Sequence, residues 1–183
     1  MAGVVLAMVA ACSSDDGDGG AEAELGPRAK CVTADPEGEL ILLPGELRAD
    51  QDPWELSGVT LRDDHNLEVV ETSTVAFGGQ PTAQGVILDY PPLKSAGIAD
   101  SLADWDERQP LPATITPGEG LHAVLVAVRL VEPASTGWLT GVTLDYSSAG
   151  EDESVTWTQQ VLVEPPEEVC TIDDVDATRE WTR

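Results

Sequence analysis

The sequence predicts an all-β protein, a single antiparallel sandwich of about seven or eight strands with one short helix that crosses an end. Three observations predict this fold class. Short runs rich in Val, Leu and Thr recur along most of the 183 residues, clusters of Gly, Pro, Asp and Asn separate these runs, and no long segment has the apolar spacing of an amphipathic helix. A chain of this length is sufficient for one domain with its own core.

Eight segments are candidate strands. They are residues 39–43, 56–62, 67–77, 85–90, 113–116, 121–131, 139–146 and 154–163. The segment 121–131 is apolar on both of its alternating faces, which predicts a central or covered strand. The last two segments alternate apolar and polar residues, which predicts strands with one face in water and places Trp157 in the core.

Turn-forming residues join several of these segments. Residues 63–66 (Asp-Asp-His-Asn) and 147–152, which include Gly150, have the composition of hairpin turns. The strands on either side of each turn are therefore expected to be antiparallel neighbours. Residues 98–105 differ, because Ile98, Leu102 and Trp105 have the i, i+4, i+7 spacing of a helix face. They predict the short crossing helix.

The three cysteines have different expected roles. Cys31 and Cys170 bracket nearly all of the strand-like sequence, whereas Cys12 ends an apolar N-terminal run. In an exported protein a bracketing pair is expected to form a disulfide. Closing so long a loop would stabilise the fold by roughly 2–5 kcal/mol. Two free thiols are the alternative.

Residues 1–11 have the character of a targeting segment. They carry no charge and are almost wholly apolar, too short to span a bilayer and suited to the apolar region of a secretory signal peptide. The end of this run, Val9-Ala10-Ala11-Cys12, resembles the lipobox of bacterial lipoproteins. The family's usual Lys or Arg before the apolar run is absent, and an Ala-rich start with a structural cysteine is the alternative.

The lipoprotein resemblance has consequences for the whole chain. It implies cleavage before Cys12, a lipid on its sulfur, and anchoring of the protein to the extracytoplasmic face of the cell membrane. Residues 12–30 would then be a flexible acidic linker, residues 31–170 the sandwich domain and residues 171–183 an acidic tail. The sandwich with its bracketing cysteines resembles the immunoglobulin-like domains of secreted actinobacterial lipoproteins, a resemblance of fold that implies no function.

Charge and composition exclude several function classes. The formal net charge is −25, with nine Lys and Arg in all, which excludes a nucleic-acid partner. A solvated acidic surface is the favoured explanation of the charge, with cation binding as the alternative. His65 and His122 are the only histidines, too few for a catalytic metal centre. They are expected in a turn and at a strand edge, so we expect neither a metal nor another cofactor.

No catalytic residue can be chosen from the sequence. There is no GxSxG motif and no CxxC motif. A carboxylate pair for glycoside hydrolysis could be drawn from Asp104, Asp106 and Glu107, but among so many acids that choice would be arbitrary. The acidic runs at residues 15–18 and 173–180 lack the glycine and glutamate positions of a calcium loop.

The most favoured function is a non-catalytic one. We expect a lipid-anchored protein-interaction or accessory module of the cell envelope, whose partners are the membrane and an envelope protein. A module that binds a glycan, another small ligand or a cation is the alternative, and Trp54, Trp105 and Trp138 are its candidate stacking residues. A hydrolase is the least favoured class.

Overall fold

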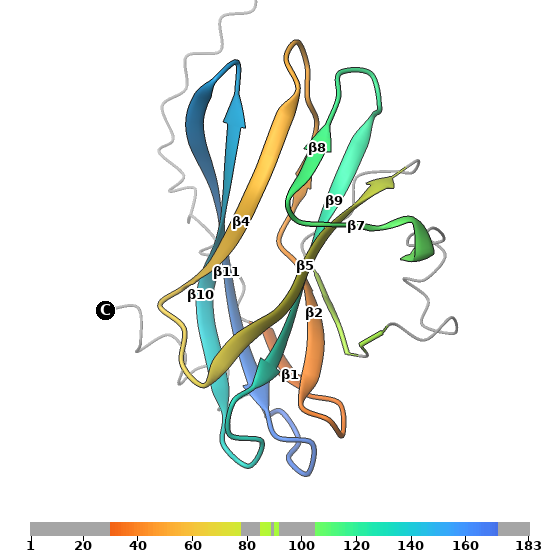
Figure 1. Ribbon diagram of the computed structural model, residues 1–183. Helices are drawn as coiled ribbons and strands as arrows, with labels where there is room; N and C mark the ends of the chain where they lie inside the picture. The colour runs from red at the N-terminus through yellow and green to blue at the C-terminus, as the bar shows by residue number, and fades with distance from the viewer. Residues whose placement is uncertain (1–29, 78–84, 89, 92–104, 172–183) are drawn as a thin grey trace, which may run out of the picture.

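Alternating apolar residues build two facing β-sheets in the computed structural model, which describes residues 30–77, 85–88, 90–91 and 105–171 (Figure 1). The elements are β1 Lys30–Thr33, β2 Glu39–Leu43, β3 Glu46–Leu47, β4 Trp54–Arg62, β5 Leu67–Phe77, β6 Gly85–Ile87, the 3-10 helix η1 Trp105–Glu107, β7 Gln109–Pro110, β8 Ala113–Ile115, β9 Leu121–Leu130, β10 Gly137–Ser148 and β11 Glu151–Glu164. No helix among the described residues is long and apolar enough to cross a membrane.

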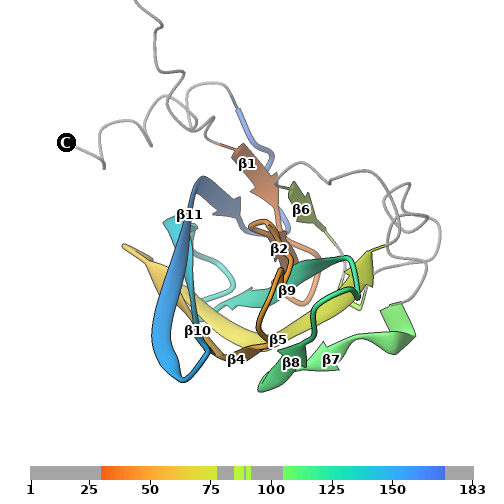
Figure 2. The same cartoon turned by 90° about the horizontal axis from the view of Figure 1, so that it is seen from above.

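The first sheet has the order β1-β11-β10-β4-β8, and the second has the order β6-β2-β9-β5-β7, with β3 paired to β9 as well. Seen from above, β10 and β11 form one layer and β2 and β9 belong to the other (Figure 2). The described pairings are antiparallel except that of β1, which runs parallel to β11. The predicted all-β sandwich is therefore confirmed, with one parallel strand that the sequence did not indicate.

Each of the eight candidate segments contains a strand, and β2 and β5 have the predicted bounds. The predicted strand at 85–90 is too long, since β6 ends at Ile87. Three strands were not predicted, because β1, β3 and β7 have only two to four residues and are defined by their partners more than by their own pattern. The predicted helix lies outside the described residues except for Trp105, where η1 begins.

One of the two predicted hairpins is wrong. The turn at residues 63–66 joins β4 to β5, and these strands belong to different sheets. Asp63 and Asn66 have positive φ angles of 42° and 54°, and His65 pairs with Trp138 in an isolated antiparallel bridge. The turn-forming composition was correct, but a turn of this kind can also carry the chain from one layer to the other.

The second predicted hairpin is confirmed. Ser148 pairs with Glu151, so the loop between β10 and β11 has two residues. Ala149 and Gly150 both have positive φ, 53° and 84°, which is the conformation of a type I′ turn. This geometry matches the twist of the two strands and sets the register of the long β10–β11 ribbon.

The core explains why β9 is apolar on both faces. One face, which includes Val124 and Val126, packs between the sheets against residues of the first sheet such as Val142 and is fully buried. The other face, which includes Leu125, belongs to a second buried cluster on the outside of the second sheet. As predicted, β9 is therefore a central strand with both faces covered.

Trp157 lies where its alternation predicts, against the main core. Its indole ring covers the backbone of Gly45, where an added Cβ would lie 2.3 Å from the ring nitrogen. Glycine is required at this position because the ring and the backbone approach so closely.

Candidate functional site

Three segments meet at one end of the sandwich, the lower end in Figure 1. They are residues 34–38 between β1 and β2, residues 132–136 between β9 and β10, and residues 165–168 after β11. They enclose a hollow of about 390 Å³, lined by Pro36, Pro133, Pro165 and Pro166 and by Glu167 and Glu168. We call these three segments the proline pole.

The segment between β9 and β10 is held by the side chain of Asn66. Its amide nitrogen donates to the main-chain oxygens of Glu132 (3.1 Å) and Ser135 (2.7 Å), and its amide oxygen accepts from the N–H of Glu132 (2.7 Å). One side chain thus satisfies backbone groups at both ends of the loop. This wall of the hollow is therefore fixed before any partner arrives.

The segment between β1 and β2 is held by Asp35. Its carboxylate accepts from the N–H groups of Glu37 (2.9 Å) and Glu39 (2.7 Å), and its main-chain oxygen accepts from Gly38 (2.9 Å). Gly38 has a φ of +82°, a conformation that glycine adopts without strain. The result is a tight turn that presents Pro36 to the hollow.

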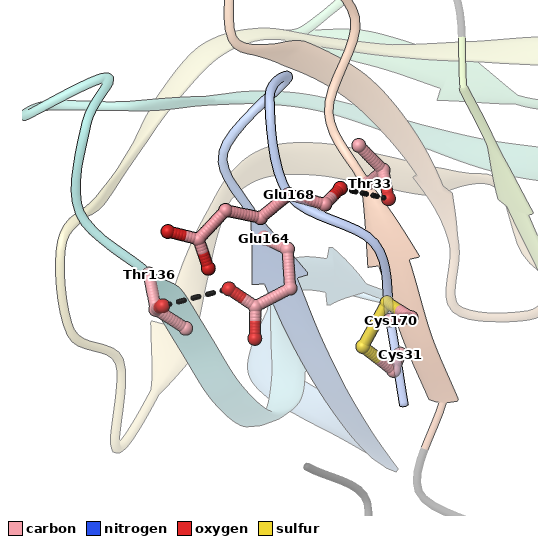
Figure 3. The surroundings of a disulfide bond; sticks show 6 residues. All are labelled: Cys31, Thr33, Thr136, Glu164, Glu168 and Cys170. Carbon is pink, nitrogen blue, oxygen red and sulfur yellow. Dashed lines mark hydrogen bonds between the residues drawn. A yellow bond between two sulfur atoms is a disulfide. The ribbon is translucent and has the colours of Figure 1, made fainter. Parts of the chain in front are cut away.

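The segment after β11 is tied to β1. The Thr33 hydroxyl donates to the main-chain oxygen of Glu168 (3.0 Å), and the Glu168 N–H closes a turn onto Pro165 (2.9 Å). Two residues later Cys170 forms a disulfide with Cys31, with 5.7 Å between their Cα atoms. Figure 3 shows that the hydrogen bond and the disulfide lie on the same strand, β1.

A buried carboxylate joins two of the segments. Glu164, at the end of β11, is 6% exposed and accepts a hydrogen bond of 2.8 Å from the Thr136 hydroxyl (Figure 3). Buried acidic side chains need such partners. The floor of the proline pole is therefore cross-linked between the β9–β10 loop and the end of β11.

The proline pole is also negatively charged. The pKa of Glu39 is raised, first by its burial and then by repulsion from Asp35 and Glu37. The repulsion shows that three carboxylates lie close together at the turn before β2. Any molecule that binds there meets fixed apolar walls in an acidic field.

The structure places two of the candidate stacking residues, Trp54 and Trp138, far apart. Trp54 stacks on Tyr146, with ring centroids 4.5 Å apart, and Trp138 lies 6.1 Å from His65. Trp54 pairs with Ser148 at one end of β10, whereas Trp138 lies at the other end. The ten-residue separation along β10 is about 33 Å. The Trp105 side chain lies outside the described part of the chain.

A second hollow, of about 480 Å³, lies beside the β10–β11 hairpin and is lined by residues that include Ser57, Asp145, Asp152 and Ser154. We call it the hairpin hollow. Its walls are polar, and Tyr146 donates a hydrogen bond of 2.8 Å to Glu153 within it. That bond is the main reason why the pKa of Tyr146 is raised.

A further group of titratable side chains surrounds Glu71 of β5, in the second sheet. Glu71 accepts hydrogen bonds from the Tyr90 hydroxyl (2.6 Å) and from Nε of Arg108 (2.9 Å). The Arg108 hydrogen bond is the largest cause of the lowered pKa of Glu71. A carboxylate held in its charged form by two donors is suited to tying segments together and not to donating a proton.

The sequence suggested a strand-edge position for His122, but the residue does not lie in an edge strand. It lies in the central strand β9, is 5% exposed, and has no hydrogen-bond partner at either ring nitrogen in the described structure. Its Nε2 is 3.7 Å from Glu119, and burial lowers its pKa. His65 lies in the turn, as predicted, and is exposed.

Of the other candidate residues from the sequence, some lie within the described residues and some lie outside them. Among the described residues, no group of three or more His, Cys, Asp and Glu side chains could hold a metal ion. Asp106 and Glu107 lie in η1 and are exposed. Cys12, Asp104 and the N- and C-terminal acidic runs lie outside the described residues.

Sequence reasoning missed the proline pole, although a signal was present. Pro36, Pro133 and the Pro165-Pro166 pair lie in turns that follow β1, β9 and β11. Knowledge of the strand directions would have placed these turns at one end. The role of Asn66 had no such signal, because its partners are 66 or more residues away.

Comparisons with known proteins give little. No protein-family model and no curated protein matches the chain. The structure of the Vibrio cholerae VesB protease is similar over 75% of this chain, at 11% identity and a TM-score of 0.33, and the chain spans 30% of that protein. The CooA pilin subunit from enterotoxigenic Escherichia coli is similar over 76% of this chain and 90% of its own, at 16% identity and a TM-score of 0.22. Neither likeness identifies a function.

Proposed function

We propose that this protein is a non-catalytic module of the bacterial cell envelope that binds another envelope protein through the proline pole. One observation carries the proposal, the proline-lined hollow whose three walls are each fixed by side-chain hydrogen bonds. Rigid walls reduce the entropy that binding would otherwise cost. Proline side chains present apolar surface with little conformational freedom to lose.

The surroundings of the hollow support a protein partner. Val131 and Val169 are among the few large apolar side chains that are exposed in the described structure, at 56% and 81%. They lie within two residues of Pro133 and within one of Glu168. Both valines thus add exposed apolar surface next in sequence to residues that line the hollow.

Within the sandwich class, we propose the immunoglobulin-like variety. The neighbours β11, β10 and β4 in one sheet, and β2, β9 and β5 in the other, have the strand orders G-F-C and B-E-D of that fold. In the variable domains of this class, the binding loops include the one that corresponds to the β10–β11 turn. The proline pole is the other end of the sandwich, because it consists of the β1–β2 and β9–β10 loops and the segment after β11.

The proposal includes a lipid anchor at Cys12, on the resemblance of Val9-Ala10-Ala11-Cys12 to a lipobox. The Cys12→Ser variant is expected to leave the membrane fraction and to appear in the soluble extracytoplasmic fraction. Cys31→Ser is the matched control, and it should remain with the membrane. Retention of the Cys12→Ser protein in the membrane would exclude the anchor.

The binding surface is tested by filling each hollow in turn. Ala134 lines the hollow of the proline pole and Ser154 lines the hairpin hollow, and both are exposed. Intact producing cells would carry the natural chain, Ala134→Phe or Ser154→Phe, and cross-linked products would be identified by mass spectrometry. We expect one recurrent envelope protein with the natural chain and with Ser154→Phe, and its loss with Ala134→Phe. Equal yields from all three chains would contradict the proposal.

A further inference from the structure

We infer that the hollow of the proline pole receives an arginine or lysine side chain of the partner protein. This inference rests on the proposed function and names the chemistry of the partner. It follows from two properties of the hollow, which has apolar walls and a pair of acidic residues, Glu167 and Glu168. Arginine and lysine are the side chains that combine an aliphatic stem with a cationic head.

The proline walls of the hollow suit the aliphatic stem of an arginine or lysine side chain. Pro36 and Pro133 come from two loops that Asp35 and Asn66 hold in place, so the space between them is fixed. Pro165 is buried and Pro166 is half-buried, and they close the third side. A volume of about 390 Å³ is sufficient for one long side chain.

The two glutamates of the hollow suit the cationic head group of the same side chain. Glu167 and Glu168 are both exposed and directly follow the two prolines. Glu168 is fixed through its backbone, because its N–H bonds to Pro165 and its oxygen accepts from Thr33. A guanidinium or ammonium group whose stem lies on the prolines would thus meet two exposed carboxylates, one of them on a residue whose main chain is held in place.

Charge complementarity selects the partner. Five acidic residues belong to the three segments: Asp35, Glu37, Glu132, Glu167 and Glu168. The segments contain no Lys or Arg, and the chain as a whole has a formal net charge of −25. A second copy of this chain would be strongly repelled. A basic segment of a different protein would be attracted.

The test uses a small probe of defined charge. The full chain with Cys12→Ser, labelled with ¹⁵N, would be titrated with N-acetylarginine methylamide and with N-acetylcitrulline methylamide. Citrulline has the same shape without the charge. We expect the arginine probe to shift the amide resonances of Ala134, Glu167 and Glu168, and the citrulline probe to bind at least about threefold more weakly, as for the loss of an exposed ion pair.

A matched pair of variants separates a local from a general charge effect. Glu167→Gln with Glu168→Gln removes two acids from the proline pole, and Asp152→Asn with Glu153→Gln removes two acids from the hairpin end. We expect about a threefold loss of arginine-probe binding in the first variant and an unchanged affinity in the second. Equal losses in both would overturn the inference, because the probe would then sense only the net charge.

The outcomes also distinguish this inference from the proposed function. If the two probes bind equally well, or if neither shifts the three resonances, the cationic side chain is excluded. The partner cross-link that Ala134→Phe abolishes would still stand in that case, and the hollow would receive an apolar group. If the cross-link is insensitive to Ala134→Phe, the proposed function fails whatever the probes do.

Discussion

The turns at the two ends of this sandwich are held in place by different kinds of contact. At the hairpin end, β10 and β11 are joined by a local two-residue turn whose geometry needs no distant residue. At the proline pole, two of the three turns are held by contacts between residues far apart in the sequence, Thr33 with Glu168 and Asn66 with Glu132, whereas Asp35 holds the third through its near neighbours. The larger hollow lies at the hairpin end. Its polar walls, however, are those of an ordinary solvated surface. The chemistry and the rigidity of the walls therefore identify a binding surface better than size does.

Removal of the disulfide is expected to have the largest effect, and to loosen the proline pole more than the hairpin end. The double variant Cys31→Ser, Cys170→Ser removes a bond between residues 139 apart, which should lower the free energy of unfolding by roughly 2–5 kcal/mol. Amide hydrogen exchange should rise more at residues 132–136 and 165–168 than along the β10–β11 hairpin. A uniform rise would show that the bond stabilises the whole domain without a special role at the pole.

Loss of the Asn66 side chain should weaken one wall of the pole. Asn66→Gly retains the positive φ of 54° but removes the hydrogen bonds to Glu132 and Ser135. We expect a loss of about 1–3 kcal/mol in unfolding free energy, measured by urea denaturation, together with a lower yield of the partner cross-link. Asp63→Gly, in the same turn and also at positive φ, is the control and should leave the cross-link unchanged.

Acid should destabilise the protein through His122, the second residue of β9, a strand that begins at the same end as the β10–β11 turn (Figure 1). Burial lowers its pKa from 6.5, so the unfolded chain binds a proton more readily than the folded one. The contribution of His122 is therefore complete above pH 6.5 and is lost as the pH falls from there toward the folded pKa, with a slope of at most about 1.4 kcal/mol per pH unit.

The measurement is unfolding free energy against pH for His122→Gln and for His65→Gln. The first variant should remove the slope just below pH 6.5, and the second should retain it, because His65 is exposed. If His65→Gln flattened the profile instead, the assignment of the slope to the buried ring would be wrong.

The smallest expected effect is a gain in stability at the hairpin. Ala149 has a φ of 53°, a region that asparagine tolerates better than alanine, and Asn-Gly is the preferred pair in a type I′ turn. Ala149→Asn should therefore raise the unfolding free energy by about 0.5–1 kcal/mol without any change in the partner cross-link. A reduced cross-link would show that the two ends are not independent.

The sequence predicted those parts of the fold that are determined by short local patterns. Period-two alternation located β10 and β11, and continuous apolarity identified β9 as central. The type I′ hairpin followed from a Gly-containing polar cluster. The same kind of composition at residues 63–66 gave a wrong hairpin, because turn residues define a reversal of the chain and not the sheet to which the next strand belongs.

The candidate site depends on relations that no local pattern contains. The hollow exists because the loops at residues 34–38, 132–136 and 165–168 meet, and because single side chains such as Asn66 and Thr33 bond to distant backbone groups. The positions of two aromatic candidates also depend on the strand pairing and not on local sequence. Trp54 and Trp138 looked equivalent in the sequence, yet they lie at opposite ends of β10.

The most direct test of the central claim, that the proline pole is the partner-binding surface, is site-specific photocross-linking in intact cells. A photoreactive phenylalanine would replace Ala134 in one strain and Ser154 in another. We expect position 134 to yield a single discrete adduct with one envelope protein, and an excess of the unlabelled Cys12→Ser chain, but not of its Ala134→Phe derivative, to compete the adduct away. An adduct at position 154 and none at position 134 would contradict this assignment, and would place the binding surface at the hairpin end.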